Sequence, residues 1–278
     1  MTPGSGVLES GEHAEPDMSG ATSGPVSRLV ELHREGGLFN AIRGANDYVR
    51  DHTPIPVTLP LHRIVSTGTL SVGAVAVDIH ITSDEDLWRA MGHGEDAVLD
   101  DFVGRVRPND TVWDVGANIG SYSLLAAATG ASVIAFEPGS SARQRLQRNA
   151  EGNGLSLSIR PVGLGLSDAN GSAALSTEVR SGIRHISEAG EQVPVARGED
   201  VDLPGADIIK IDVEGHERQV LDGLGDRLEA CRCCYVEIHG GVSRDAVEKR
   251  LENAGLEVAD EWGETRREAI VRADGGGA

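Results

Sequence analysis

The feature that most constrains the fold is a regular alternation of β-rich and helical segments that begins after Pro108. Short runs rich in Val and Ile alternate with longer runs in which apolar residues recur every three or four positions. This alternation is typical of a parallel sheet whose strands are joined by crossover helices. We expect strands at 111–116, 132–138, 157–164, 207–214, 233–240, 256–262 and 267–273, and helices at 119–129, 140–150, 216–229 and 243–254.

The last two expected strands lie too close together for a crossover helix, so we expect them to pair antiparallel. A seven-stranded, mostly parallel sheet with an antiparallel C-terminal strand favours an α/β fold, the Rossmann-like sandwich of class I methyltransferases, over a plain dinucleotide-binding fold. Asn170-Gly171 is a typical type I′ hairpin turn, which predicts a small antiparallel excursion after the third strand. The polar residues 176–200 are expected to form a surface insertion.

The charge balance argues against nucleic acid as a partner. The chain has 25 basic and 44 acidic residues and a formal net charge of −19, which would repel a phosphate backbone. Lys210 and Lys249 are the only lysines, and the other basic residues are arginines. An acidic, lysine-poor chain is typical of proteins in a concentrated salt cytosol, and we expect a halophile-like surface. A GC-rich genome would also replace lysine by arginine, so both explanations stay open.

The sequence contains no signal for membrane insertion or secretion. No run of 18 apolar residues is present, and the N-terminus lacks both a basic start and an apolar stretch. Cys231, Cys233 and Cys234 have no second cysteine pair that would complete a zinc site, so we expect reduced thiols in a buried strand. These observations predict a cytoplasmic protein that does not bind membranes.

The segment "TVWDVGANIGSYSLLAAATG" combines a strand, a glycine turn and a helix, which is the arrangement of a nucleotide-type cofactor site. Gly116 and Gly120 let the backbone approach a ligand, and Glu137 ends the next strand where a ribose diol would lie. No Lys or Arg occurs between Thr111 and Ser141, so a pyrophosphate would meet Asp114 without a cation. The sulfonium and ammonium of S-adenosylmethionine suit this carboxylate, so we expect S-adenosylmethionine as cofactor.

Four blocks also resemble one known family in their order and approximate spacing. They are "DVGANIGSYS", "FEPGSSARQRLQRNAEGN", "PVGLGLSDANGSAAL" and "IIKIDVEGHERQVLDGL", and together they resemble the FkbM-type methyltransferases over roughly residues 95–271. The resemblance implies S-adenosylmethionine-dependent methyl transfer, mostly to oxygen on sugars or secondary metabolites. It also implies that Asp212 and Glu214 stand near the transferred methyl group. The expected cofactor-binding residues are Asp114, Gly116, Ala117, Asn118, Gly120, Glu137, Pro138, Gly163, Leu164 and Asp212.

The domain organisation follows from this resemblance and from the N-terminal composition. Residues 1–25 are polar and glycine-bearing, and we expect a disordered leader. Residues 26–94 combine helical spacing with a β-rich stretch, so we expect a small helical and β extension. Ser83 is expected to cap a helix because acids follow it in the first turn. Residues 95–278 are expected to form the methyltransferase domain.

Polar side chains recur on the fourth and fifth expected strands. Lys210, Asp212 and Glu214 fall on alternate positions and should share one face of a strand, at the sheet edge where ligands bind in open α/β sheets. A hydroxyl acceptor must lose a proton, and a histidine can take it near neutral pH. The expected catalytic residues are Lys210, Asp212, Glu214, His216, Glu237 and His239.

Two alternatives remain open at this level. The carboxylates and histidines of this group could bind a divalent metal, but Gly215 should end the shared face before His216, so we predict no metal. The favoured function is O-methyl transfer to a hydroxyl of a small molecule, sugar or glycan. A nucleic-acid 2′-O-methyltransferase and a non-catalytic cofactor-binding homologue are the alternatives, and the oligomeric state is open.

Overall fold

The computed structural model describes residues 65–92, 95–175, 186–187, 190–265 and 268–276. All of them belong to the second of the chain's two structural units, Leu59–Ala278. The expected leader, the helix near residues 26–42 and any strand before residue 65 lie outside the described residues. The expected boundary between extension and methyltransferase domain stays a prediction.

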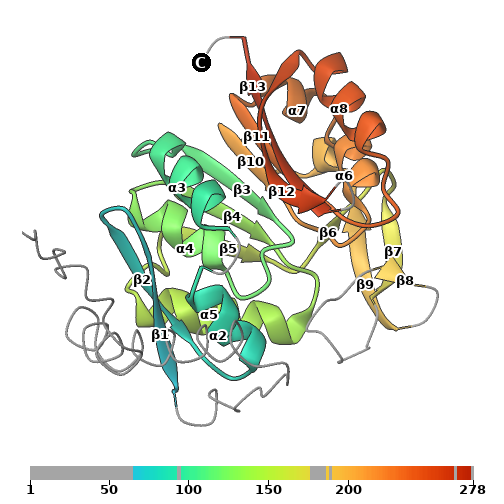
Figure 1. The fold of residues 1–278 in the computed structure, drawn as a ribbon. Coiled ribbons are helices and arrows are strands. Elements are labelled where there is room, and N and C mark those ends of the chain that lie inside the picture. Colours follow the sequence, from blue (N-terminus) through green and yellow to red (C-terminus); the bar gives the residue numbers. More distant parts are fainter. Residues whose placement is uncertain (1–64, 93–94, 176–185, 188–189, 266–267, 277–278) are drawn as a thin grey trace, which may run out of the picture. The chain divides into compact units, whose positions relative to one another are not determined.

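A seven-stranded sheet forms the centre of the described unit (Figure 1). Its order is β12-β13-β11-β10-β3-β4-β5, in which the five strands from β11 to β5 run parallel. β13 pairs antiparallel with both β11 and β12, so the fold class expected from the sequence is confirmed. The strands are β3 (Thr111–Val115), β4 (Ser132–Phe136), β5 (Ile159–Val162), β10 (Ile208–Ile211), β11 (Cys233–Ile238), β12 (Leu256–Thr265) and β13 (Glu268–Gly275).

Helices cover both faces of this sheet (Figure 1). On one face lie α3 (Asp96–Arg105), α4 (Ser121–Ala128) and α5 (Ser140–Gly152), and on the other lie α6 (Glu217–Leu224), α7 (Asp226–Ala230) and α8 (Arg244–Asn253). The segment 216–229, expected as one helix, forms the two helices α6 and α7. Gly225 interrupts it with a φ of 51°, and a Cβ at this position would overlap the carboxylate of Glu199.

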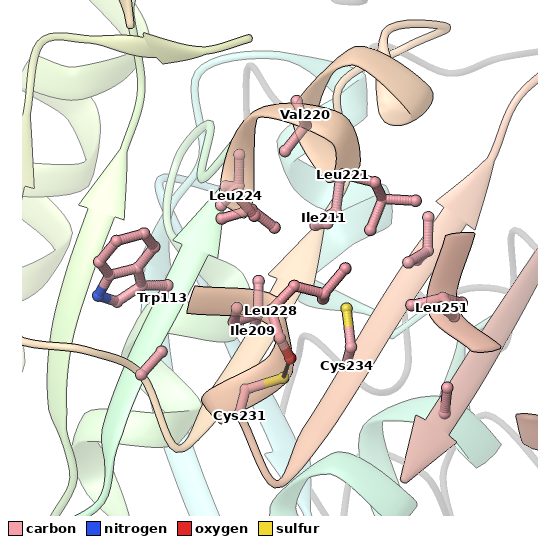
Figure 2. Close-up of a cluster of buried hydrophobic side chains, with 14 of the residues drawn as sticks. Trp113, Ile209, Ile211, Val220, Leu221, Leu224, Leu228, Cys231, Cys234 and Leu251 are labelled. Atoms are coloured by element: carbon pink, nitrogen blue, oxygen red, sulfur yellow. Dashed lines mark hydrogen bonds between the residues drawn. The ribbon is translucent and has the colours of Figure 1, made fainter. Parts of the chain in front are cut away.

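Strand alternation decides which side chains of β10 join the core and which join the site. Ile209 and Ile211 pack against Leu221 and Leu224 of α6 in a buried apolar cluster, shown in Figure 2. Lys210 lies between them in sequence and therefore points to the opposite face, beside α4. β10 is fully buried and has one polar position, so Lys210 places a single positive charge on the face of the sheet that α4 covers.

A hairpin and a short helix precede the sheet. β1 (Thr67–Val72) pairs antiparallel with β2 (Val75–His80), and β2 contacts α4 and α5. α2 (Asp84–Ala90) follows, capped by Ser83 as expected. The hydroxyl of Ser83 accepts a hydrogen bond from the Asp86 amide, and the Asp86 carboxylate accepts one from the Ser83 amide. This capping box fixes where α2 begins.

A second, four-stranded sheet replaces the expected hairpin after β5. β6 (Gly165–Leu166) pairs with β9 (Glu191–Ala196), which in turn pairs with β7 (Gly171–Leu175), whose other neighbour is β8 (Ile186–Ser187). The prediction of a small antiparallel excursion is confirmed, but the type I′ hairpin at Asn170 is wrong. The Asn170 side chain instead bonds the Arg197 amide and the Asp200 carboxylate, because β9 lies between β6 and β7.

The three cysteines are buried thiols in and beside β11. Cys231 and Cys234 belong to the apolar cluster of Figure 2, and burial raises the pKa of Cys231 to about 12. Within the described residues, no helix has the length and hydropathy that crossing a bilayer requires. The cytoplasmic location stays a prediction.

Candidate active site

The glycine turn after β3 packs directly against the end of β10. Gly116 has a φ of 82°, and a Cβ added there would lie 1.7 Å from the carbonyl oxygen of Asp212. The amides of Gly116 and Ala117 both donate to the carbonyl of Phe136 on β4. Asn118 adopts a left-handed φ of 48° before α4 begins. The turn is thus fitted tightly between the ends of β4 and β10, and only glycine is compatible with position 116.

The two acids expected near the cofactor lie on adjacent strands. Glu137 follows β4, and its carboxylate accepts hydrogen bonds from the amides of Asn118 (2.9 Å) and Gly139 (2.7 Å). Asp114 is buried within β3 and accepts a bond of 2.6 Å from the Ser123 hydroxyl. Burial raises the pKa of Asp114, although the charge of Lys210 opposes the shift.

The apolar residues at and after the ends of β4 and β5 are only partly exposed. Phe136 and Leu166 are fully enclosed in the core, whereas Pro138, Gly163 and Leu164 are half-buried. A Cβ on Gly163 would lie 2.9 Å from the guanidinium carbon of Arg143 on α5, which donates to the carbonyls of residues 137 and 138. An arginine therefore covers the end of β5, two residues beyond the cation-free interval noted in the sequence.

Asp212 and Glu214 reach the sheet edge through a turn and do not share a strand face. β10 ends at Ile211, and Glu214 and Gly215 have φ values of 52° and 96°. This left-handed pair folds Glu214 back beside Asp212, which strand alternation alone could not predict. The expectation of a shared strand face is therefore wrong, while the two carboxylates do lie together, both facing His239.

Lys210 is enclosed by carboxylates and one aromatic ring. Its Nζ lies 3.0 Å from an oxygen of Asp212, 3.9 Å from one of Glu237 and 4.5 Å from the centre of the Tyr122 ring. Burial alone would lower the pKa of Lys210, but the surrounding carboxylates raise it above its ordinary value. Lys210 is therefore a permanent cation that holds Asp212 ionised, since it lowers the pKa of that carboxyl.

His239 follows β11 and is bracketed by acids. Its Nδ1 lies 2.7 Å from an oxygen of Glu217, while its Nε2 lies 3.3 Å from Glu214, 3.5 Å from Glu237 and 3.7 Å from Asp212. Burial would lower the pKa of His239, but these carboxylates raise it to about 11. His239 is thus an imidazolium at neutral pH in the ligand-free site. An imidazolium has no lone pair with which to accept a proton.

Glu214 is the group poised to titrate near neutral pH. Burial raises its pKa to about 7, the charges of Asp212 and Glu237 act in the same direction, and the charge of His239 opposes them. A carboxylate with such a pKa is suited to general base catalysis, because a large fraction is ionised near neutral pH and the ionised form still binds a proton effectively.

His216 lies apart from this group. It occupies the N-cap position of α6, and its Nε2 lies 2.9 Å from the hydroxyl of Ser167. Burial lowers the pKa of His216. The structure thus brings together five of the six expected catalytic residues, Lys210, Asp212, Glu214, Glu237 and His239, and places the sixth beside the second sheet.

Asp212, Glu214 and His239 also have the chemistry of a metal-binding group. One potential ligand atom from each lies within 4.8 Å of the other two. Lys210 and the His239 proton already balance part of the charge of these carboxylates. The absence of a metal therefore stays a prediction that chelation can test.

A cavity of about 500 Å³ opens onto these residues. Asp212, Glu214, Glu237 and His239 line one side of it, and Ser121 and Tyr122 of α4 line another. The Tyr122 hydroxyl donates a bond of 2.6 Å to Glu95, which also lines the cavity. The sheet edge, the start of α4 and the N-terminal elements thus enclose one space large enough for a small organic acceptor.

Sequence reasoning missed Glu217, Glu95 and Arg143. Glu217 is fully buried, and one of its oxygens accepts from the Gly215 amide (2.9 Å) as well as contacting His239. Acids are common at the first position of a helix, where they interact favourably with the helix dipole, so the sequence gives no sign of a further role for Glu217. Only its complete burial in the structure reveals this role. Glu95 and Arg143 come from separate segments, and no local pattern ties either to the site.

Comparison with known proteins identifies the family. Residues 114–258 match the methyltransferase FkbM domain, which is more than half of the chain. The chain belongs to the FkbM methyltransferase family. The resemblance and the enzyme class predicted from the sequence are confirmed.

Three relatives of this FkbM methyltransferase share between 16% and 33% sequence identity with it. It is 33% identical over 214 residues to the hexuronic acid methyltransferase AglP of Haloferax volcanii, covering 72% of this chain and 86% of the relative. A solved methyltransferase FkbM from Methylobacillus flagellatus KT shares 17% identity with a TM-score of 0.47, covering 68% of this chain and 53% of that protein. The magnesium protoporphyrin IX methyltransferase of Synechocystis PCC 6803, solved with bound SAM, shares 16% identity with a TM-score of 0.45. The match covers 67% of this chain and 81% of that protein.

Proposed function

We propose that this enzyme transfers a methyl group from S-adenosylmethionine to a hydroxyl of a sugar, and that the sugar is a hexuronic acid within a glycan or a related small molecule. The observation that carries the proposal is the cavity that Glu214, poised to accept a proton, lines together with Ser121 and Tyr122 at the start of α4. The 33% identity to a hexuronic acid methyltransferase supports the acceptor class.

The residues proposed to bind the cofactor suit the chemistry of S-adenosylmethionine. The Ser121 hydroxyl at the start of α4 is buried and has no hydrogen-bond partner among the described residues, as expected for a group that a ligand would satisfy. We assign the turn at residues 116–120, Ser121, Glu137 and Asp212 to cofactor binding. When bound, S-adenosylmethionine supplies a methyl group activated by a positively charged sulfur.

The chain's own residues then position the acceptor and remove its proton. Glu214 takes the proton of the acceptor hydroxyl, and the His239 imidazolium 3.3 Å away steadies the carboxylate. Lys210 keeps Asp212 ionised, so a negative charge persists at the end of β10 to face a cationic ligand. Alignment of acceptor and cofactor accounts for most of the expected acceleration, because the leaving group is already activated.

The test is methyl transfer from radiolabelled S-adenosylmethionine to glycan fractions, with the methylated product identified by mass spectrometry. We expect label on an oxygen of a hexuronic acid residue. Calorimetric titration with S-adenosylmethionine and with NADH provides the cofactor control, and binding of NADH alone would contradict the proposal.

The nucleic-acid alternative finds no support in the site. Acids outnumber bases in the cavity lining, and the formal net charge of the chain is −19. A nucleic-acid phosphate backbone would be repelled by this surface. The polar array around Glu214 likewise argues against a homologue that only binds the cofactor.

A further inference from the structure

The wall of the cavity opposite the catalytic carboxylates comes from residues that precede the family match. The match begins at residue 114. The opposite wall is built by β1, α2 and the start of α3, with Leu70, Glu85, Trp88, Arg89 and Glu95 facing the cavity. Cofactor binding and proton removal therefore lie within the family region, whereas this wall belongs to the N-terminal elements of this particular chain.

Trp88 has the properties of a stacking surface. Its side chain lines the cavity and is 43% exposed. An exposed indole beside a polar cavity offers an apolar face to a ligand whose edge is polar. A sugar ring is such a ligand, because its C–H groups form an apolar face and its hydroxyls point outward.

The acids around Trp88 complement hydroxyl groups. Glu85, Glu95 and Glu237 line the same cavity, and ionised carboxylates act only as hydrogen-bond acceptors. Each already has a partner within the protein, and the acceptor capacity that remains suits a ligand with several donors, such as a sugar with free hydroxyls. A phosphate or other doubly charged anion would be repelled by the same side chains.

Arg89 is the cation of this wall. Its Nε and Nη2 both donate to one oxygen of Glu85, at 3.2 and 3.1 Å, which uses two of the five guanidinium N–H groups. The pair is partly exposed and joins residues four apart on a short helix, an arrangement that contributes little stability. The remaining donors of Arg89 take no part in this pair and can serve one singly charged carboxylate, while the charge of Arg89 also interacts with Asp212 and Glu95.

We infer that α2 is the acceptor-selecting element, with Trp88 stacking on the sugar ring and Arg89 binding the carboxylate of a hexuronate. The inference rests on the proposed function and adds to it the residues that choose the acceptor. Trp88 and Arg89 are specificity residues that do not themselves accept the proton. The charge of Arg89 also lowers the pKa of Glu214, an effect that should be the same for both acceptors.

The experiment compares a simple hexuronide with the matching neutral hexoside, which differs only in the carboxylate. We expect the natural enzyme to prefer the hexuronide in kcat/KM. Arg89→Gln should reduce this preference about 10- to 100-fold, the range for a hydrogen bond to a charged group. Trp88→Ala should raise KM for both acceptors about tenfold with little change in kcat, and Trp88→Phe should recover part of the loss.

The matched control is Arg218→Gln, which removes an arginine from the exposed pair with Asp222 on α6, outside the cavity lining. It should change neither preference nor KM. Hexuronide binding is also measured calorimetrically on enzyme loaded with S-adenosylhomocysteine, so that binding is seen without turnover. The inference would be overturned if Arg89→Gln lowered kcat/KM equally for both acceptors, or if the natural enzyme bound no hexuronide. Loss of S-adenosylmethionine binding in the natural enzyme would overturn the proposed function instead.

Discussion

Replacing Gly116 by alanine should damage the site far more than the same change at an unhindered glycine. The left-handed φ of 82° costs a non-glycine residue about 1–2 kcal/mol. The new Cβ would also lie 1.7 Å from the Asp212 carbonyl oxygen, against an ordinary contact of about 3.4 Å, so the turn or the end of β10 must move by more than about 1 Å. A shift of that size in a positioned site costs about 100-fold in rate.

Gly154→Ala is the matched control. Gly154 has a φ of 69°, and a Cβ there would meet no atom within 4 Å. It should lose only the left-handed cost of about 1–2 kcal/mol and keep full affinity for the cofactor. Urea denaturation gives the free energy of unfolding of each variant, and calorimetry gives its dissociation constant for S-adenosylmethionine.

We expect Gly116→Ala to lose more stability than Gly154→Ala and to bind S-adenosylmethionine at least tenfold more weakly. The refuting result is a Gly116→Ala enzyme that matches Gly154→Ala in stability, affinity and rate. In that case the contact between the glycine turn and Asp212 would not position the site.

The remaining predictions concern the charged groups. Glu214, the proposed base, faces His239, Asp212, Glu237 and Arg89. Because only its ionised carboxylate accepts a proton, kcat should rise as pH increases through about 7. Glu214→Gln should abolish this rise with pH and lower kcat about 100-fold or more. Glu217→Gln should lower the pKa of His239 from about 11, followed by NMR of the imidazole, and reduce kcat about tenfold at unchanged S-adenosylmethionine affinity; an unshifted imidazole would contradict the bracketing role. Dialysis against EDTA should leave activity unchanged, and lost activity restored by a divalent cation would contradict the predicted absence of a metal. The melting temperature should rise between low and molar KCl if the charge of −19 reflects salt adaptation, and a flat curve would rule that out.

The sequence predicts the main sheet well because its signals are local. Each strand of the seven carries a short β-rich run, and the helices between them carry their own periodicity, so element type and order follow without knowledge of tertiary contacts. The glycine turn proposed for the cofactor is recognisable for the same reason, since Gly116 and Glu137 follow consecutive strands.

What could not be predicted depends on unusual backbone or on distant partners. Glu214 adopts a left-handed conformation that side chains other than glycine rarely take, so strand alternation placed it wrongly. β9 reaches between β6 and β7 from about 20 residues further along the chain, which no turn signal at Asn170 reveals. The cavity wall on α2 likewise arises from packing between segments far apart in sequence.

Glu217 joins two loops through a single atom. The same oxygen accepts from the amide of Gly215, after β10, and contacts His239, after β11. Since both bonds end on one atom of a completely enclosed side chain, neither loop can drift without carrying the other. Heat should therefore not loosen these two loops before the rest of the domain unfolds, and activity should persist until the whole domain melts cooperatively.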